Sequence, residues 1–182
     1  MHIYKAIKFV ADQLNLSSEL FVTAESSCDS PFGFNWKSQK IVVPNFAVDD
    51  LVFMMPKSSM QLIQRIMEMN EIDNTNDNIF LFCLFHETKH YFDYNDDCNM
   101  FMFSEGIHNM YTLWLRQSND IEEAYQFSRS FAAELYGKEF AISFSPDNKR
   151  EYISSIAYRC CEAERRADNF AVGRLQIGAL SI

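Results

Sequence analysis

Two histidines and a glutamate near the middle of the chain have the spacing of a metal-dependent hydrolytic site. The segment reads His86-Glu87-Thr88-Lys89-His90, an HExxH pattern. On a helix, positions i and i+4 share one face, so His86 and His90 can bind a single zinc ion together. Glu87 lies about 100° around such a helix from His86. It can act as the general base that deprotonates a zinc-bound water for attack on a carbonyl carbon.

A catalytic zinc site needs a third protein ligand and an open coordination position, and the best candidate for the ligand is Glu164. Glu164 and Asp168 are spaced to share one helical face. Glu164 would bind the metal, while Asp168 would accept a hydrogen bond from the free ring nitrogen of a zinc-bound histidine. The small residues Ala163, Ala167 and Ala171 would let this helix approach the HExxH helix closely.

Other residues stay open for these roles. Asp96 stands where metzincin-like sites place their third ligand, although Asp93 replaces the glycine that such sites need in the intervening turn. The remaining candidates for the third ligand are Glu105, Glu123 and Glu134. An oxyanion-stabilising donor is expected opposite the base, and His108 or a nearby tyrosine could supply it.

The residue pattern of the segments that must position these side chains predicts an α+β, mostly helical fold. In this fold a small antiparallel sheet accompanies a central HExxH helix. Helices are expected at about 3–14, 58–70, 79–94, 105–116 and 121–135, with Gly137 as a C-terminal cap and a long final helix from near Asp147. Short β-like runs occur at 20–23, 40–43 and 140–144. The polar stretch 73–78 supplies an N-cap for the central helix, whose start is apolar all round, as is typical of a helix crossing the centre of a fold.

Composition narrows the class of protein further. The 182 residues, 48% of them hydrophobic, predict one domain with one sizeable core. A net charge of −9 without a basic cluster disfavours direct nucleic-acid binding. The five cysteines have no ligand spacing and favour a reducing compartment. Neither a signal peptide nor a membrane span is visible, so we expect a cytoplasmic protein with no membrane partner.

The motifs also resemble those of a known group of enzymes. An HExxH helix followed by a helix bearing ExxAD-x-FA is the pattern of gluzincin-type peptidases, and the chain looks most like the ImmA/IrrE family of small intracellular metallopeptidases. The resemblance is carried by the HExxH segment and by Glu164 to Ala171. It implies that His86, His90 and Glu164 are the zinc ligands and that Glu87 is the base.

The same resemblance bears on the rest of the chain. Residues 32–43 resemble the hairpin that precedes the HExxH helix in that family. The interval between His90 and Glu164 is longer than the family usually shows, so residues 96–147 are expected to form an inserted helical section within a single domain, 1–182. The resemblance implies a particular cytoplasmic protein as the substrate, such as a transcriptional repressor.

The sequence therefore predicts a zinc-dependent peptidase that hydrolyses a peptide bond in a cytoplasmic protein. One alternative is a catalytically silent protein that keeps the zincin fold and binds a partner, and the intact Glu87 argues against it. The other is a metal-free helical interaction protein in which the HExxH pattern arose by chance. That alternative predicts no stoichiometric zinc.

Overall fold

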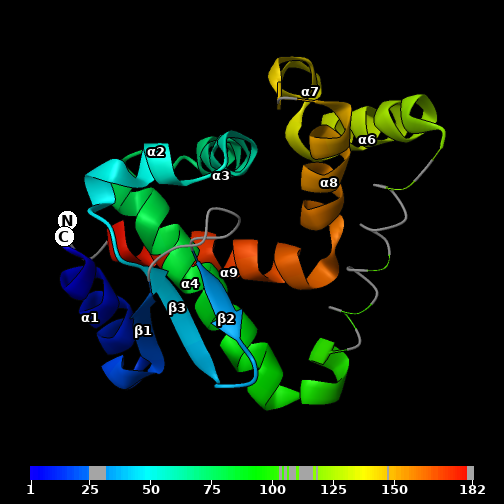
Figure 1. Cartoon of the computed structure of the whole chain (residues 1–182). Coiled ribbons are helices and arrows are strands. Elements are labelled where there is room, and N and C mark those ends of the chain that lie inside the picture. Colours follow the sequence, from blue (N-terminus) through cyan, green and yellow to red (C-terminus); the bar gives the residue numbers. More distant parts are fainter. Residues whose placement is uncertain are drawn as a thin grey trace.

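A buried helix, α4 (Asn76–Asp96), forms the centre of the computed structural model, which describes residues 1–24, 32–102, 104, 106, 110, 117, 119–146 and 148–179. Thr75 is its N-cap, and the Thr75 side chain accepts a hydrogen bond from the Asn78 N–H. Every residue from Ile79 to His86 is buried. A helix that is apolar on all sides is stable only when other elements enclose it, and Figure 1 shows α4 surrounded in this way. The predicted central helix is confirmed.

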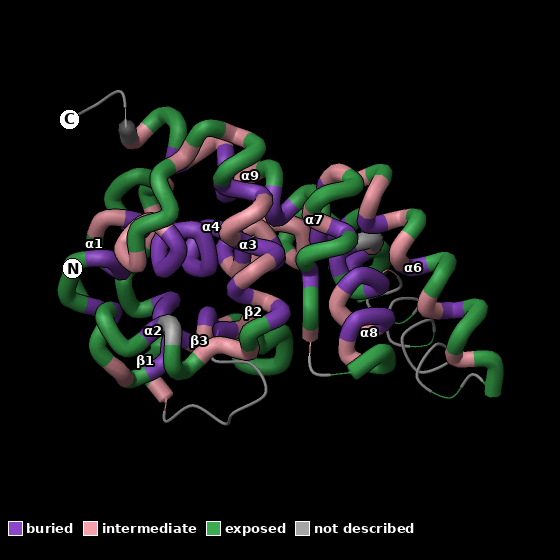
Figure 2. The backbone as a smooth tube through the Cα atoms, turned by 90° about the horizontal axis from the view of Figure 1, so that it is seen from above, coloured by how far each residue is buried: buried purple, intermediate pink, exposed green. Residues whose placement is uncertain are grey.

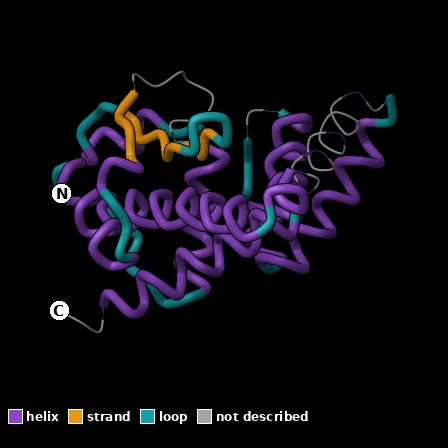
Figure 3. The backbone as a smooth tube through the Cα atoms, turned by 90° about the horizontal axis from the view of Figure 1, so that it is seen from below, coloured by secondary structure: helices purple, strands orange, loops and turns teal. Residues whose placement is uncertain are grey.

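The strands form a small mixed sheet in the order β1-β3-β2, made of β1 (Phe21–Ala24), β2 (Gly33–Asn35) and β3 (Lys40–Pro44). β2 and β3 pair antiparallel, since a tight turn joins them, but β1 pairs parallel to β3. The prediction of an antiparallel sheet is therefore wrong for β1. Alternation along a strand shows which face is buried, but it does not show the direction of the partner strand. Figure 3 shows the strands together on one side of the helices.

The helices predicted before α4 are both present. Helix α1 (Ile3–Leu14) packs its buried face against α4. Helix α3 (Lys57–Met69) follows a short helix, α2 (Leu51–Met54), that the sequence pattern did not reveal. Single-turn 3-10 helices lie at Ser18–Leu20 and Val48–Asp50.

The next three described helices along the chain form a second group, which Figure 1 shows at the upper right, apart from the central helix. Helix α6 (Ile121–Tyr136) ends at Gly137, whose φ is 95°, and packs against α7 (Lys138–Ser143) and α8 (Lys149–Cys160). The prediction of a helix at 121–135 with a glycine cap is confirmed. The helix predicted at 105–116 lies largely outside the described residues. The single domain with an inserted section at 96–147 stays a prediction.

Two predictions for this half of the chain are wrong. The strand-like run 140–144 lies largely in the helix α7, where Phe140 stacks on Phe144 with ring centroids 5.3 Å apart. These two rings are four residues apart, a spacing that puts them on one helical face. The single helix predicted from Asp147 is broken, because Cys161 has an extended backbone (φ −66°, ψ 139°). The chain turns there from α8 into α9 (Glu162–Ala179).

Most buried residues belong to one core around α4 that reaches from α1 to α9, and Figure 2 shows α4 as its most buried helix. A smaller cluster of Ala124, Ile153 and Ala157 lies between α6 and α8. In the described part of the chain, no helix combines the length and apolar character needed to cross a membrane. The predicted α+β, mostly helical fold is thus confirmed.

Candidate metal centre

The site lies where α9 meets α4, which is the largest interface between two elements in the described part of the chain. Ala163, Ala167 and Ala171 are buried on α9, and their small side chains leave room for a close approach, as predicted. Glu164 and Asp168 are also buried on α9. Charged residues are seldom fully buried unless they are paired, so both carboxylates need partners across the interface.

The partners of Glu164 are the two histidines of α4. The Nε2 atom of His86 lies 3.0 Å from Glu164 Oε2 and 3.1 Å from His90 Nε2. His90 Nε2 lies 3.4 Å from Glu164 Oε1. All three residues are buried. The structure thus brings together the three predicted ligands in a group that could hold a metal ion, and we call His86, His90 and Glu164 the ligand cluster.

The spacing of the donor atoms fits a tetrahedral ion. Ligand atoms about 2.0–2.1 Å from a tetrahedral zinc ion lie roughly 3.3–3.4 Å from one another. The three distances in the ligand cluster are 3.0, 3.1 and 3.4 Å. Movements of a few tenths of an ångström would suffice for binding. Two imidazole nitrogens and one carboxylate are also a donor set that zinc commonly takes.

The charges of the metal-free cluster balance each other. Burial disfavours the imidazolium of His86, but hydrogen bonds with Asp168 and Glu164 outweigh burial and raise the pKa of His86 to about 10. Burial would raise the pKa of Glu164, but hydrogen bonds with His86 and His90 hold it well below its usual value. Without metal, a proton on the imidazoles therefore offsets the buried carboxylate. A bound cation would take the place of that proton.

Asp168 holds the other side of His86. Its Oδ1 atom lies 2.9 Å from His86 Nδ1, as expected for a carboxylate that orients a metal-binding imidazole. The guanidinium of Arg159 donates a hydrogen bond to the same oxygen. Burial would lower the pKa of Arg159, but the charge of Asp168 raises it, so the guanidinium stays charged. His90 has no such partner, since its buried Nδ1 is without a hydrogen bond in the described part of the chain.

Two further polar groups lie beside the ligand cluster. Glu87 is half-buried, and Tyr158 of α8 is 37% exposed as a residue. The Tyr158 side chain hydrogen-bonds Glu164. Burial of the phenol and the charges of Glu164 and Glu87 raise the pKa of Tyr158, so its hydroxyl stays protonated. A hydrogen-bond donor and a candidate base, each only partly buried, therefore lie beside the ligand cluster.

The alternative ligands that the structure describes lie elsewhere. Asp96, Glu123 and Glu134 are exposed and belong to no metal-binding group in the described chain. Asp93 pairs with Lys89 one turn earlier on α4. Glu105 and His108 lie outside the described residues. The role of oxyanion donor predicted for His108 stays a prediction.

Sequence reasoning missed Arg159, and the reason is the break at Cys161. On one continuous helix, Arg159 and Asp168 would lie on opposite faces and roughly 13 Å apart along the axis. Because the chain turns between α8 and α9, the two side chains meet instead. The extended backbone at Cys161 leaves no clear signal in the sequence. Tyr158 was missed for the same reason.

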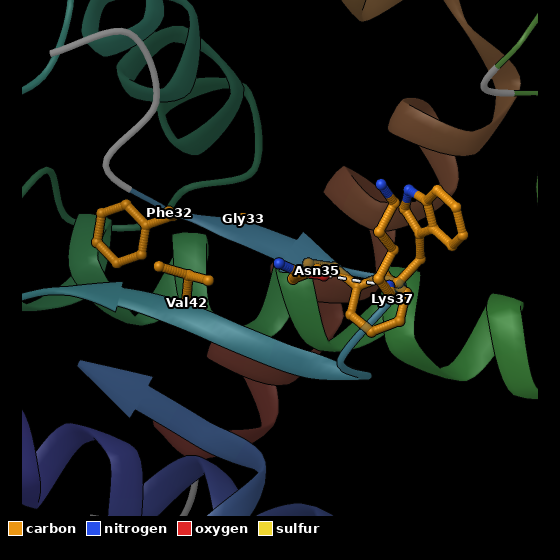
Figure 4. A pocket seen from close by; sticks show the side chains of 7 residues that line it. Phe32, Gly33, Asn35, Lys37 and Val42 are labelled. Carbon is orange, nitrogen blue, oxygen red and sulfur yellow. Dashed lines mark hydrogen bonds between the residues drawn. The ribbon is translucent and has the colours of Figure 1, made fainter. Parts of the chain in front are cut away.

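A pocket of about 470 Å³ lies along the β2–β3 hairpin. Figure 4 shows Phe32 and Val42 at one end of it and Lys37 at the other. The Lys37 ammonium lies 5.3 Å from the ring centre of Trp36. The hairpin also lies close to the ligand cluster, because the ring of Phe101 is 5.9 Å from Phe34 and 6.0 Å from His90.

Comparisons with protein families, with curated proteins and with solved structures found no match for this chain. The side chains of the site are therefore the basis on which a function can be assigned.

Proposed function

We propose that this protein is a zinc-dependent peptidase that hydrolyses a peptide bond in a protein substrate. The observation that carries the proposal is the buried ligand cluster of His86, His90 and Glu164, with Glu87 beside it on the same helix. A metal that served structure alone would be expected to have four protein ligands in a closed site. Three ligands next to a carboxylate base are the arrangement of hydrolytic zinc sites.

The chemistry can be assigned to the side chains. Zinc, when bound by the ligand cluster, acts as a Lewis acid that polarises water and the carbonyl oxygen of the substrate. Glu87 takes a proton from the attacking water and passes it to the leaving amine as the C–N bond breaks. The Tyr158 hydroxyl can donate a hydrogen bond to the carbonyl oxygen as negative charge develops on it. Asp168 holds the His86 ring in place throughout.

The hairpin beside the cluster suits a peptide substrate. In the described part of the chain, β2 pairs with β3 alone, so its other edge offers backbone N–H and C=O groups. An extended peptide can add to such an edge as a further strand. The pocket along the hairpin, with Trp36 and Lys37 at its rim, would then receive one or two side chains of the peptide.

The resemblance of the HExxH and ExxAD segments to the ImmA/IrrE family supports this proposal and extends it. In this extended form, the protein belongs to that family and cleaves a particular cytoplasmic protein, such as a transcriptional repressor. The net charge of −9 agrees with a protein substrate rather than nucleic acid.

The test is cleavage of a peptide library derived from protein digests, followed by mass spectrometry. Zinc-loaded wild type should produce new termini at a consistent sequence, while Glu87→Gln should bind the same amount of zinc and cleave nothing. Glu139→Gln, an exposed glutamate on α7, is the matched control and should cleave normally. A zinc-loaded wild type that binds peptides without cleaving them would favour the catalytically silent protein.

A further inference from the structure

Arg159 is the buried charge at this site that the proposed reaction does not use directly. It is 7% exposed and lies at the end of α8, next to the turn into α9. Its guanidinium has two described contacts: the Asp168 carboxylate and the ring of Tyr158, whose centre is 5.4 Å away. A buried arginine held on two sides has a fixed position.

The oxygen that Arg159 contacts is the one that faces His86. Asp168 Oδ1 accepts a hydrogen bond from the Arg159 guanidinium and lies 2.9 Å from His86 Nδ1. This oxygen therefore acts as an acceptor toward the guanidinium, and it can accept a second hydrogen bond from an imidazole N–H. His86 Nδ1 must then carry a proton in order to pair with it. In a neutral imidazole, this leaves the lone pair on Nε2, the atom that faces His90 and Glu164.

We propose that Arg159 is a positioning residue for the metal centre, which acts through Asp168 to fix the tautomer and the ring orientation of His86. The inference rests on the proposed metal site and extends it to α8. Without the guanidinium, Asp168 would lose the partner that holds its Oδ1 atom against His86 Nδ1 and could turn away from the ring. The His86 ring would then no longer be held in the orientation that turns Nε2 toward His90 and Glu164.

A purely structural role, in which Arg159 only joins α8 to α9, makes a different prediction. It predicts a lower unfolding temperature for an Arg159 variant. It also predicts that any effect of Arg159 on zinc affinity is the same whether or not Asp168 is replaced. The positioning role predicts that the effects of Arg159 and Asp168 on zinc affinity are strongly non-additive, because they act on the same imidazole.

The experiment measures the zinc dissociation constant by competition with a chromophoric chelator. Arg159→Met and Asp168→Asn should each weaken binding about 10–100-fold, the usual effect of removing a group that orients a metal ligand. The double variant should be no weaker than the worse single variant. Arg159→Lys keeps the charge but loses the forked geometry of the guanidinium, so its loss of zinc affinity should be smaller. This variant takes the place of Arg159→Met if the latter does not fold. Arg150→Met, an exposed arginine of α8, should bind like wild type.

A second readout follows the His86 ring directly. The chain has four histidines, so ¹⁵N-histidine NMR spectra are simple enough to assign. Zinc-loaded wild type should show a protected proton on His86 Nδ1 that is lost in Arg159→Met. Unchanged zinc affinity together with an unchanged Nδ1 proton in that variant would overturn the positioning role, and so would additive losses in the double variant.

The two proposals can fail separately. A wild type that binds no zinc would overturn both proposals. If wild type binds zinc but cleaves no peptide, the proposed peptidase alone fails, and the Nδ1 proton of His86 in the zinc-loaded protein still decides the role of Arg159. Loss of its protection in Arg159→Met would support the positioning role, and retention would refute it.

Discussion

Zinc added to the metal-free protein should raise its unfolding temperature, because the folded state alone has the ligand cluster in place. The donor atoms of the cluster are already 3.0–3.4 Å apart, so binding needs little rearrangement. At a free zinc concentration of a thousand times the dissociation constant, binding stabilises the folded state by about 4 kcal/mol. For a chain of 182 residues, each kcal/mol shifts the midpoint by about 2–4 °C, so we expect a rise of about 8–16 °C.

The matched perturbation removes one ligand. Zinc sites with four ligands bind with about 10–16 kcal/mol, or roughly 3 kcal/mol per ligand, so His90→Ala should weaken binding more than 100-fold. At the same zinc concentration, the stabilisation should fall to about 1 kcal/mol, and the shift to about 2–4 °C.

The assay is thermal unfolding followed by circular dichroism, with and without zinc, and His2→Ala serves as an exposed-histidine control that should respond like wild type. An equal shift in wild type and His90→Ala, or no shift in either, would refute the reasoning.

Three further outcomes follow from the same structure. The pKa of His86 is raised to about 10 without metal, whereas zinc requires the neutral ring. Zinc binding should therefore release about one proton, and the zinc affinity should rise about tenfold for each pH unit from pH 6 to 8. Calorimetry in buffers of different ionisation enthalpy measures that proton, and a dissociation constant independent of pH would contradict it. Tyr158→Phe should leave zinc binding and KM unchanged but lower kcat about 10²–10³-fold. Tyr4→Phe, at an exposed position, is the control and should leave kcat unchanged. Equal kcat values for wild type and Tyr158→Phe would show that Tyr158 takes no part in the reaction. Ala167→Leu should destabilise the protein by about 1–3 kcal/mol in urea and weaken zinc binding, because it separates α9 from α4, while Asn169→Leu on the exposed face should do neither.

The parts of the site that sequence predicted are those that helical periodicity determines. His86 and His90 share a face of α4 because they are four residues apart, and Glu164 and Asp168 share a face of α9 for the same reason. The alanines of α9 predicted that this helix can approach α4 closely, and they are buried where the two helices pack. Local spacing thus favoured Glu164 over the other carboxylates, which stayed open as alternatives.

The features that sequence did not predict depend on where the chain turns and which segments then meet. The break at Cys161 is what brings Arg159 onto Asp168, and no proline or glycine marks it. The parallel pairing of β1 with β3 depends on strand order, which a run of four or five residues cannot specify. The short run 140–144 was misread because aromatic residues favour strands in general, while here they are spaced for a helix.

The zinc content of purified protein tests the central claim most directly, with wild type measured beside His86→Ala and Glu164→Ala. The ligand cluster predicts about one zinc per chain in wild type and a sharp loss in both variants, since each removes one of three ligands. A wild type without zinc even after reconstitution, or full zinc content in both variants, would contradict the assignment of this cluster as the metal centre.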